Sequence, residues 1–455
     1  MLIKRYILKS LVFAAILCTS DHIFAQDILT GYVNEGLASN LVMQQQHFSL
    51  DKAMNALKQA SSMRLPSVDL DVTYTQASGG RSIILPVGDM LNPVYNTLNA
   101  LTQSQAFPNI ENESINFLPK NYYDAKVRTT LPLLNTDIEA NKQVKKGMVE
   151  IQKLQIETYK KELTLQIKEA YFNYLMAYRA VSIYQNALQL AEEGLRVNQK
   201  LFDAGKGLPA YVIRAKADIA QAESQIIEAQ QKLSNAALYF NMLLNRKSDA
   251  VIEIDPQLSE SEMLGQSELA NNYVENREEL KSLQSNVDIQ KVVEKNNKQF
   301  LVPELSAFMD LGSQAEGMKV NSESMYYMVG LNLKMPIFNG NRNRLKIQQS
   351  KIEVAEAQSK IEDAAQKLQL SWMVARNDVV AANANLQKTK AQLEAADTYQ
   401  RLIQKGYAAG VNTYIETVDA RVQYTNAKQA VNINAYKLMT AIAKLERETA
   451  TLNTK

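Results

Sequence analysis

The sequence predicts a mainly α-helical chain with a small β part, organised as a two-fold internal repeat. Three observations in the 455 residues support this prediction: short runs in which apolar and polar residues alternate, long stretches with a heptad seam, and landmarks that recur in order. Alternation with a period of two is typical of β-strands, whereas a seam that advances by threes and fours is typical of packed helices. Each half of the chain is therefore expected to contain both strands and long helices.

The N-terminus, residues 1–25, has the features of a secretory signal peptide. A positively charged start is followed by an apolar run from Leu11 to Leu17 and by a cleavage site that ends at Ala25. The apolar run is too short for a membrane-spanning helix. Lipid attachment at Cys18 is disfavoured because the preceding residue, Leu17, is not small. The positive residues are Lys4, Arg5 and Lys9.

Loss of the signal peptide leaves few reactive side chains. It removes the only cysteine, Cys18, and His22, so that His47 is the one remaining histidine. We therefore expect no disulfide, no Cys/His metal cluster, no cofactor and no enzyme active site. The 50 Lys and Arg residues balance the 48 Asp and Glu residues, which gives no electrostatic reason to expect nucleic acid as a partner.

The internal repeat rests on three pairs of landmarks that occur in the same order in both halves. The spacing of the second and third landmarks is nearly equal in the two halves, but the first half carries an insertion between its first two landmarks. The pairs are 64–70 with 301–307, 127–133 with 331–337, and 202–205 with 407–410. The predicted organisation is a signal peptide (1–25), a first structural repeat (26–246), a connector (247–267), a second structural repeat (268–448) and a C-terminal tail (449–455).

Four candidate strands lie beside prolines that mark strand–helix corners. The alternating runs contain seven to nine residues, which is close to the length of a transmembrane β-strand, and no later apolar run is long enough for a membrane-spanning helix. Strands in lipid must pair every backbone group within a closed barrel, and four strands are too few to close one, so the chain must oligomerise. The strands are expected at 68–75, 125–131, 305–311 and 327–335, with Pro66 and Pro303 before the first and third, and Pro132 and Pro336 closing the second and fourth.

Each pair of strands is followed by a long helix and a returning helix. No proline interrupts residues 137–200, and the heptad seam from Leu163 to Phe202 recurs from Leu368 to Tyr407. A helix over the 73 residues between Pro132 and Gly205 would run for about 110 Å, which suits a tube that crosses the periplasm. The turn glycines are Gly205, Gly207 and Gly410, the returning helices are expected at 210–245 and 413–448, and shorter helices are expected at 31–63 and 268–300.

The insertion between the first two strands, residues 76–121, is expected to be a long loop without regular structure. It contains Gly79, Gly80 and four prolines. Such a loop is unusual in a compact soluble domain but typical of the external face of an outer-membrane barrel. The matching loop in the second half, residues 312–324, is short.

This layout resembles the TolC family of outer-membrane efflux proteins over nearly all the mature chain. The most specific segment runs from Tyr407 to Ala420, where Tyr-x-x-Gly is followed by the acidic residues Glu416 and Asp419. The resemblance implies a homotrimer in the outer membrane of a Gram-negative bacterium, with a 12-stranded barrel continued by a periplasmic helical tunnel. It also implies two partners, a periplasmic adaptor (membrane fusion) protein and an inner-membrane pump of RND or ABC type that supplies the energy.

The family's lock at the closed periplasmic aperture is only partly matched. In the family, a tyrosine, an arginine and an aspartate on the two turns hold this aperture closed. Tyr407 matches the tyrosine, but Asn412 stands at the arginine position and Tyr211 at the aspartate position. Two interpretations of Arg214 remain open: it pairs with Glu416 or Asp419, or it is an ordinary exposed charge.

The two carboxylates also have two interpretations. Glu416 and Asp419 are spaced to share one helical face, so they are predicted to form an acidic ring at the periplasmic constriction. Alternatively, they are solvated surface groups.

Three other functions fit the sequence less well than an outer-membrane duct does. A periplasmic or surface coiled-coil scaffold without a pore would explain the signal peptide and the seam, but not the alternating strands with their mirrored prolines. An adaptor protein would pair one helical hairpin with small β-domains, whereas this chain repeats its helix pairs around four strands. An enzyme is disfavoured because no catalytic cluster is evident. The sequence therefore favours a passive duct for efflux or type I secretion.

Overall fold

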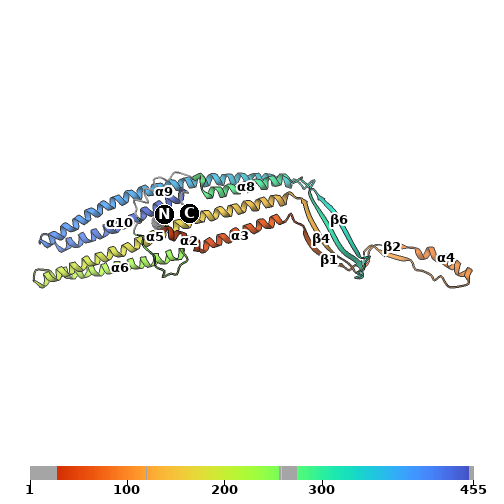
Figure 1. Ribbon diagram of the computed structural model, residues 1–455, viewed down its shortest axis with the longest axis horizontal. Coiled ribbons are helices and arrows are strands. Elements are labelled where there is room, and N and C mark those ends of the chain that lie inside the picture. The colour runs from red at the N-terminus through yellow and green to blue at the C-terminus, as the bar shows by residue number, and fades with distance from the viewer. Residues whose placement is uncertain (1–27, 119, 256–257, 259–273, 450–455) are drawn as a thin grey trace, which may run out of the picture. The chain divides into compact units, whose positions relative to one another are not determined.

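A computed structural model of the chain describes residues 28–118, 120–255, 258 and 274–449 (Figure 1). The expected signal peptide with Cys18, most of the connector and residues 450–455 of the tail lie outside these residues. The described chain forms two compact units: one contains the residues up to Ala53, 148–287 and those from Glu356, and the other contains 54–147 and 288–355. The mainly helical class with a small β part is confirmed.

The second unit is built on an antiparallel sheet of the four expected strands, in the order β1-β4-β5-β6. Its rows of paired residues alternate in character. Leu70, Val127, Leu311 and Tyr327 form one continuous apolar row, whereas the adjacent row contains the Arg128–Asp310 ion pair, with a nitrogen–oxygen distance of 2.6 Å. The strands are β1 (Ser67–Thr75), β4 (Tyr122–Leu134), β5 (Glu304–Glu316) and β6 (Met325–Lys334).

The apolar face of this sheet is exposed in the single chain. Leu70 is 71% exposed, Leu331 is 69% exposed and Tyr327 is 79% exposed. The outer edges of β1 and β6 have no strand beside them among the described residues. A sheet with an uncovered apolar face and two open edges is incomplete as a soluble structure.

The corner prolines agree with the sequence analysis except at one position. Pro66 and Pro303 directly precede β1 and β5, and Pro336 follows the end of β6. Pro132, however, lies inside β4, which continues to Leu134. The pairing with β5 changes register between these two residues, and such a bulge accommodates a residue that cannot donate a backbone hydrogen bond.

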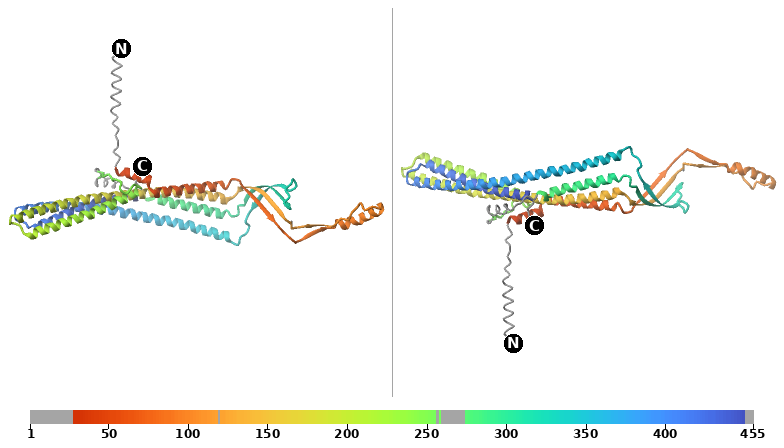
Figure 2. Two further views of the ribbon diagram at one scale, coloured as in Figure 1. Left: turned by 90° about the horizontal axis from the view of Figure 1, so that it is seen from below. Right: turned by 90° about the horizontal axis from the view of Figure 1, so that it is seen from above.

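The insertion 76–121 is not structureless, which corrects the sequence-based expectation. It contains a two-stranded sheet of β2 (Ser82–Leu85) and β3 (Glu113–Asn116), with the helix α4 (Val87–Thr102) between them. Figure 2 shows β2 and β3 leading away from the end of the four-stranded sheet toward α4. The helix was not expected because it contains Pro93, and a proline normally indicates a turn or the end of a helix.

The long helices come in pairs of matching length. Helices α5 (Thr136–Asp203) and α9 (Arg342–Ala408) have 68 and 67 residues, and the returning helices α6 (Pro209–Leu243) and α10 (Tyr414–Glu448) have 35 each. The described helices include none that combines the length and apolar character needed to cross a membrane. The shorter helices are α2 (Ile28–Ser39), α3 (Leu41–Ser62), the 3-10 helix η1 (Val274–Asn276) and α8 (Glu278–Lys298).

The core of the first unit follows the predicted seam. Leu163 and Ile167 on α5 are fully buried, and they belong to one cluster with the rings of Tyr32, Tyr171 and Phe240. These rings lie 5.0–5.7 Å apart, centre to centre, in tilted or edge-on contacts that favour aromatic packing. The aromatic cluster therefore joins α2, α5 and α6.

A buried ionic cluster lies at the start of α8. Arg277 is 2% exposed and contacts the carboxylates of Glu279 and Glu448, while Arg447 also contacts Glu279 at 2.7 Å. Burial acts to raise the pKa of Glu279, but the hydrogen bond from Arg277 and the charge of Arg447 lower it to about 2. The cluster therefore remains ionised at neutral pH and ties α8 to the end of α10.

Candidate functional site

The two turns between long and returning helices share one backbone design. Gly205 and Gly410 have positive φ angles of +70° and +74°. In each turn the next amide reaches back to the end of the long helix: Lys206 N donates to Leu201 O at 2.8 Å, and Val411 N donates to Gly406 O at 2.8 Å. This left-handed cap favours glycine and reverses the chain tightly.

Each returning helix then begins with a recognisable start signal. Pro209 is the first residue of α6, where its missing N–H costs nothing. Thr413 caps α10 in a capping box with Glu416, whose carboxylate accepts a 2.6 Å hydrogen bond from Thr413 N and a 3.3 Å bond from Asn412 Nδ2. The hydrogen bonds from Thr413 and Asn412 lower the pKa of Glu416, which keeps this carboxylate charged.

Three tyrosines pack together behind the turns. Tyr414 is 1% exposed, and the rings of Tyr211 and Tyr407 lie 5.5 Å and 6.1 Å from its ring. The hydroxyl of Tyr407 donates to Asn198 Oδ1 at 2.9 Å. Burial raises the pKa of both Tyr407 and Tyr414, so both phenols stay neutral and act as hydrogen-bonding groups.

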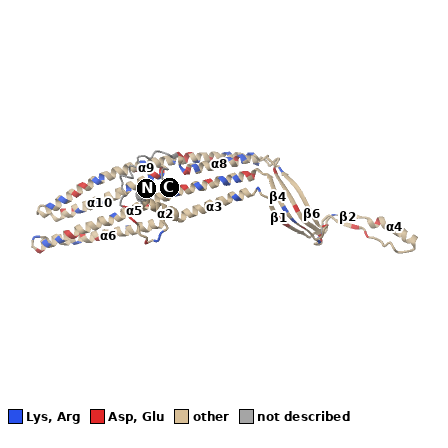
Figure 3. Ribbon diagram, viewed as in Figure 1, with Lys and Arg blue, Asp and Glu red and all other residues tan. Residues whose placement is uncertain are grey.

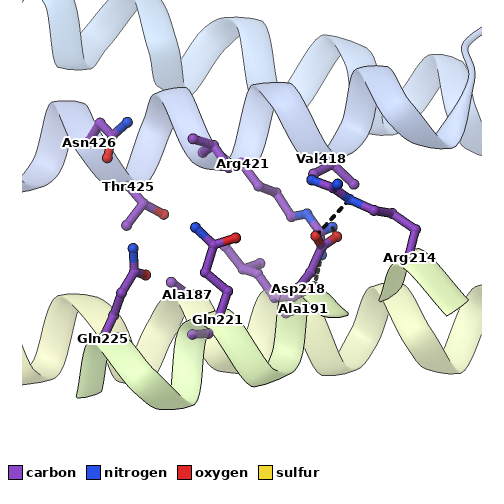
Figure 4. Close-up of a pocket in the computed structure, with 13 residues that line it drawn as sticks. Ala187, Ala191, Arg214, Asp218, Gln221, Gln225, Val418, Arg421, Thr425 and Asn426 are labelled. Carbon is purple, nitrogen blue, oxygen red and sulfur yellow. Dashed lines mark hydrogen bonds and ion pairs between the residues drawn. The ribbon is translucent and has the colours of Figure 1, made fainter. Parts of the chain in front are cut away.

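The most connected side chain near the turns is Arg421 on α10 (Figure 4). Its guanidinium donates to Leu190 O on α5 at 2.6 Å, to the Tyr414 hydroxyl at 3.2 Å and to Asp218 on α6 at 3.4 Å. Asp218 also pairs with Arg214 at 3.0 Å. We call Leu190, Asp218, Tyr414 and Arg421 the clasp, because they link the hairpin α5–α6 to α10.

The clasp was missed by sequence analysis, although one signal points to it. Gly194 is a glycine in the interior of α5, where glycine is otherwise unfavourable. A Cβ atom at this position would lie 2.7 Å from the Arg421 guanidinium and 3.3 Å from the Tyr414 hydroxyl. An isolated glycine in a long helix can therefore indicate where another side chain approaches closely.

The structure brings only some of the expected aperture residues together. Tyr407 and Tyr211 flank Tyr414, and Asn412 contacts Glu416. Within one chain, Arg214 pairs with Asp218 rather than with Glu416 or Asp419. Asp419 is exposed, and its carboxylate accepts a 2.7 Å hydrogen bond from Gln423. The acidic ring of the two carboxylates stays a prediction, since it involves several copies.

No residue set in the described ranges suggests a metal centre. Groups of three or more His, Cys, Asp or Glu side chains with suitable geometry are absent from this part of the chain. The chemistry that the turns do offer is ionic and hydrogen-bonding, through carboxylates, guanidinium groups and phenols.

Comparisons with known proteins agree with this arrangement. A family model described as "Outer membrane efflux protein" matches residues 32–246 and 269–450. The alkaline protease secretion protein AprF of Pseudomonas aeruginosa is 22% identical over 336 residues, covering 71% of this chain and 69% of its own length. Outer membrane protein TolC of Escherichia coli is 20% identical over 451 residues, covering 94% and 83% of the two chains.

A solved structure shows the same fold. The outer membrane protein VceC of Vibrio cholerae superposes with a TM-score of 0.72 at 15% identity, and the match covers 92% of this chain and 95% of that chain. At this identity the likeness concerns the fold alone.

Proposed function

Because the chain belongs to the outer membrane efflux protein family, it is an outer-membrane channel component, and we propose that three copies form one passive duct. The family consists of channel proteins rather than enzymes, found in the outer membrane of Gram-negative bacteria with large periplasmic helical portions. The family match does not itself provide three features that we propose for this chain: the trimer, the closed barrel and the two-fold repeat.

The observation that carries the proposal is the incomplete sheet. Its apolar face is exposed, its opposite face carries Arg128, Asp310 and other charges, and neither edge is paired with another strand of the described chain. Lipid would cover the apolar face, and pairing of β1 with β6 of the next copy would satisfy both edges. Three copies give twelve strands, enough for a barrel with a water-filled interior lined by the charged face.

The experiment that tests the duct combines mass and conductance. The detergent-solubilised protein should have the mass of a trimer and should form ion-conducting pores in planar lipid bilayers. A monomer that leaves the membrane on carbonate washing would overturn the proposal. That result would favour the alternative of a coiled-coil scaffold without a pore.

Three copies would also bring the turns together at the periplasmic end of the duct. There Glu416 and Asp419, with Tyr407, Asn412, Tyr211 and Arg214 nearby, are proposed to line the aperture. Replacing Glu416 by Gln and Asp419 by Asn tests the ring, because Gln can preserve the capping box while the charge is lost. A cation preference that is the same in this variant and in the wild type would exclude the acidic ring.

Gating is assigned to the clasp rather than to the lock known from the family. Asn412 and Tyr211 lack the charges that such a lock needs, whereas Arg421 links α10 to α5 and α6. Breaking this link would free one hairpin from the other near the aperture. The clasp is thus proposed to favour the closed state.

The duct is passive, so a pump must supply energy. We propose a periplasmic adaptor protein and an inner-membrane pump of RND or ABC type as partners. A relative named for alkaline protease secretion is consistent with type I secretion, whereas the description of the family model is consistent with efflux. Crosslinking in whole cells, followed by identification of the trapped inner-membrane protein, would distinguish the two pump classes.

A further inference from the structure

Helix α4 presents an uncovered apolar stripe. Its large apolar residues recur at spacings of three and four, so they share one face of the helix. Met90 is 70% exposed, Val94 is 52% exposed and Leu101 is 77% exposed. The stripe consists of Val87, Met90, Leu91, Val94, Leu98 and Leu101.

The neighbouring face of α4 is held firmly by the chain that returns from it. Asn92 exchanges two hydrogen bonds with the backbone of Ile110, at 2.9 and 3.0 Å, and Asn99 exchanges two with the backbone of Phe107, at 2.8 and 3.1 Å. The ring of Tyr95 also packs on that of Phe107 at 5.6 Å. These contacts fix the rotation of the helix, so the apolar stripe is turned outward by specific bonds.

The charges of α4 argue against a lipid surface as its partner. Asp89 is the one charged residue of the helix, which contains no Lys or Arg, and Figure 3 shows α4 almost without charge colour. Helices that lie on anionic membranes usually combine an apolar face with basic residues on the polar face. The polar side of α4 instead carries the asparagines that bind its own return segment.

The position of the insertion in the chain points to a second copy. β2 follows β1 after a short link, and β1 is the edge strand that must pair with the next copy when the barrel closes. Each insertion therefore starts at a joint between copies. The stripe also has the spacing of a coiled-coil seam, which is completed by identical helices.

We propose that the three α4 helices of one trimer pack stripe against stripe and form a cap over the outer mouth of the duct. This inference rests on the proposed trimeric duct. A barrel of twelve strands is about 24 Å across, so its axis lies about 12 Å from the wall. Helix α4, with 16 residues, is about 24 Å long, and the β2–β3 hairpin adds to its reach.

Engineered cysteines test the cap directly, because the one native cysteine, Cys18, lies in the predicted signal peptide and is replaced by Ser in every variant. Met90→Cys and Leu101→Cys lie in the stripe, whereas Asn96→Cys lies on the opposite face, is exposed and serves as the matched control. Trimers are placed in lipid nanodiscs, one per disc, and treated with an oxidant or with a short bismaleimide. The stripe variants should give at least about ten times more covalent dimer than the control, because their thiols are held at a high effective concentration.

Two results would overturn the cap, and a third would instead overturn the duct. Stripe and control variants that crosslink equally little in intact trimers would show that the helices do not meet. Quenching of a fluorophore at Leu101→Cys by lipid-borne spin labels would show that the stripe faces the membrane. The mass of the same preparation separates the two proposals: trimers without crosslinks refute the cap alone, whereas monomers refute the duct.

Discussion

Replacement of Arg421 by Ala should loosen the closed end of the duct. The change removes the 2.6 Å bond to Leu190 O and the contacts to Tyr414 and Asp218 in one step. Asp218 keeps its ion pair with Arg214, so it is not left wholly uncompensated. The loss therefore falls mainly on the link between α10 and the hairpin α5–α6.

The size of the effect follows from burial. The side chains of Arg421 and Asp218 are only 14% and 11% exposed, so water cannot replace their contacts well. Removing one partner of a buried pair costs about 3–5 kcal/mol, and the remaining contact with Arg214 places this case near the lower end. About 3 kcal/mol corresponds to a roughly hundredfold shift in population between linked and separated hairpins.

Planar-bilayer recordings measure this shift as open probability. The matched control is Arg401→Ala, because Arg401 pairs with Asp397 at 3.1 Å within α9 but is 65% exposed, and such surface pairs contribute about 1 kcal/mol or less. Arg421→Ala should spend far more time open than either the control or the wild type. Equal open probability in Arg421→Ala and Arg401→Ala would refute the role of the clasp.

Three other changes test separate parts of the structure. Gly194→Ala should displace the Arg421 guanidinium and raise the open probability of the pore. The thermal stability of the helices should not fall, since Ala favours a helix over Gly by about 1 kcal/mol. An unchanged open probability would show that the added methyl group fits beside Arg421 without displacing it. The pKa of Glu279 is lowered from 4.5 to about 2, so its stabilisation is complete above pH 4.5 and is lost as the pH falls toward 2. Between pH 4.5 and pH 2 the free energy of unfolding should fall by about 3 kcal/mol more in the wild type than in Glu279→Gln. Acid unfolding followed by circular dichroism measures this difference, and an equal fall in both proteins would contradict it. Leu70→Arg places a charge on the lipid-facing side at a cost of about 2–4 kcal/mol near the bilayer centre, whereas Asp69→Asn on the other face should be tolerated. Trimer yield after extraction compares the two, and equal yields would argue against the assigned faces.

The strands and long helices could be predicted because each shows its own period. β1 alternates along its whole length and β6 alternates from Val329 to its end, and the seam on α5 lies where Leu163 and Ile167 are buried. The sequence also located both turns, because the left-handed backbone conformation at residues 205 and 410 favours glycine and both positions hold glycine.

The features that were missed depend on contacts between distant segments. Helix α4 contains Pro93 and is stabilised by Asn92 and Asn99, whose partners lie on the return segment. The clasp requires Arg421 to approach α5 beside Gly194, which a period within one helix cannot indicate. Such contacts override local propensity and become visible only in three dimensions.

The clasp has one property that bears on how the duct would open. The residues that form it, Arg421, Leu190, Tyr414 and Asp218, all come from one chain, so each copy would carry a complete clasp of its own. Each subunit of a trimer would then release its own hairpin as a separate first-order event. A trimer with three such independent events passes through stages with one and two hairpins released, so single-pore recordings should show graded sublevels between the closed and the fully open current.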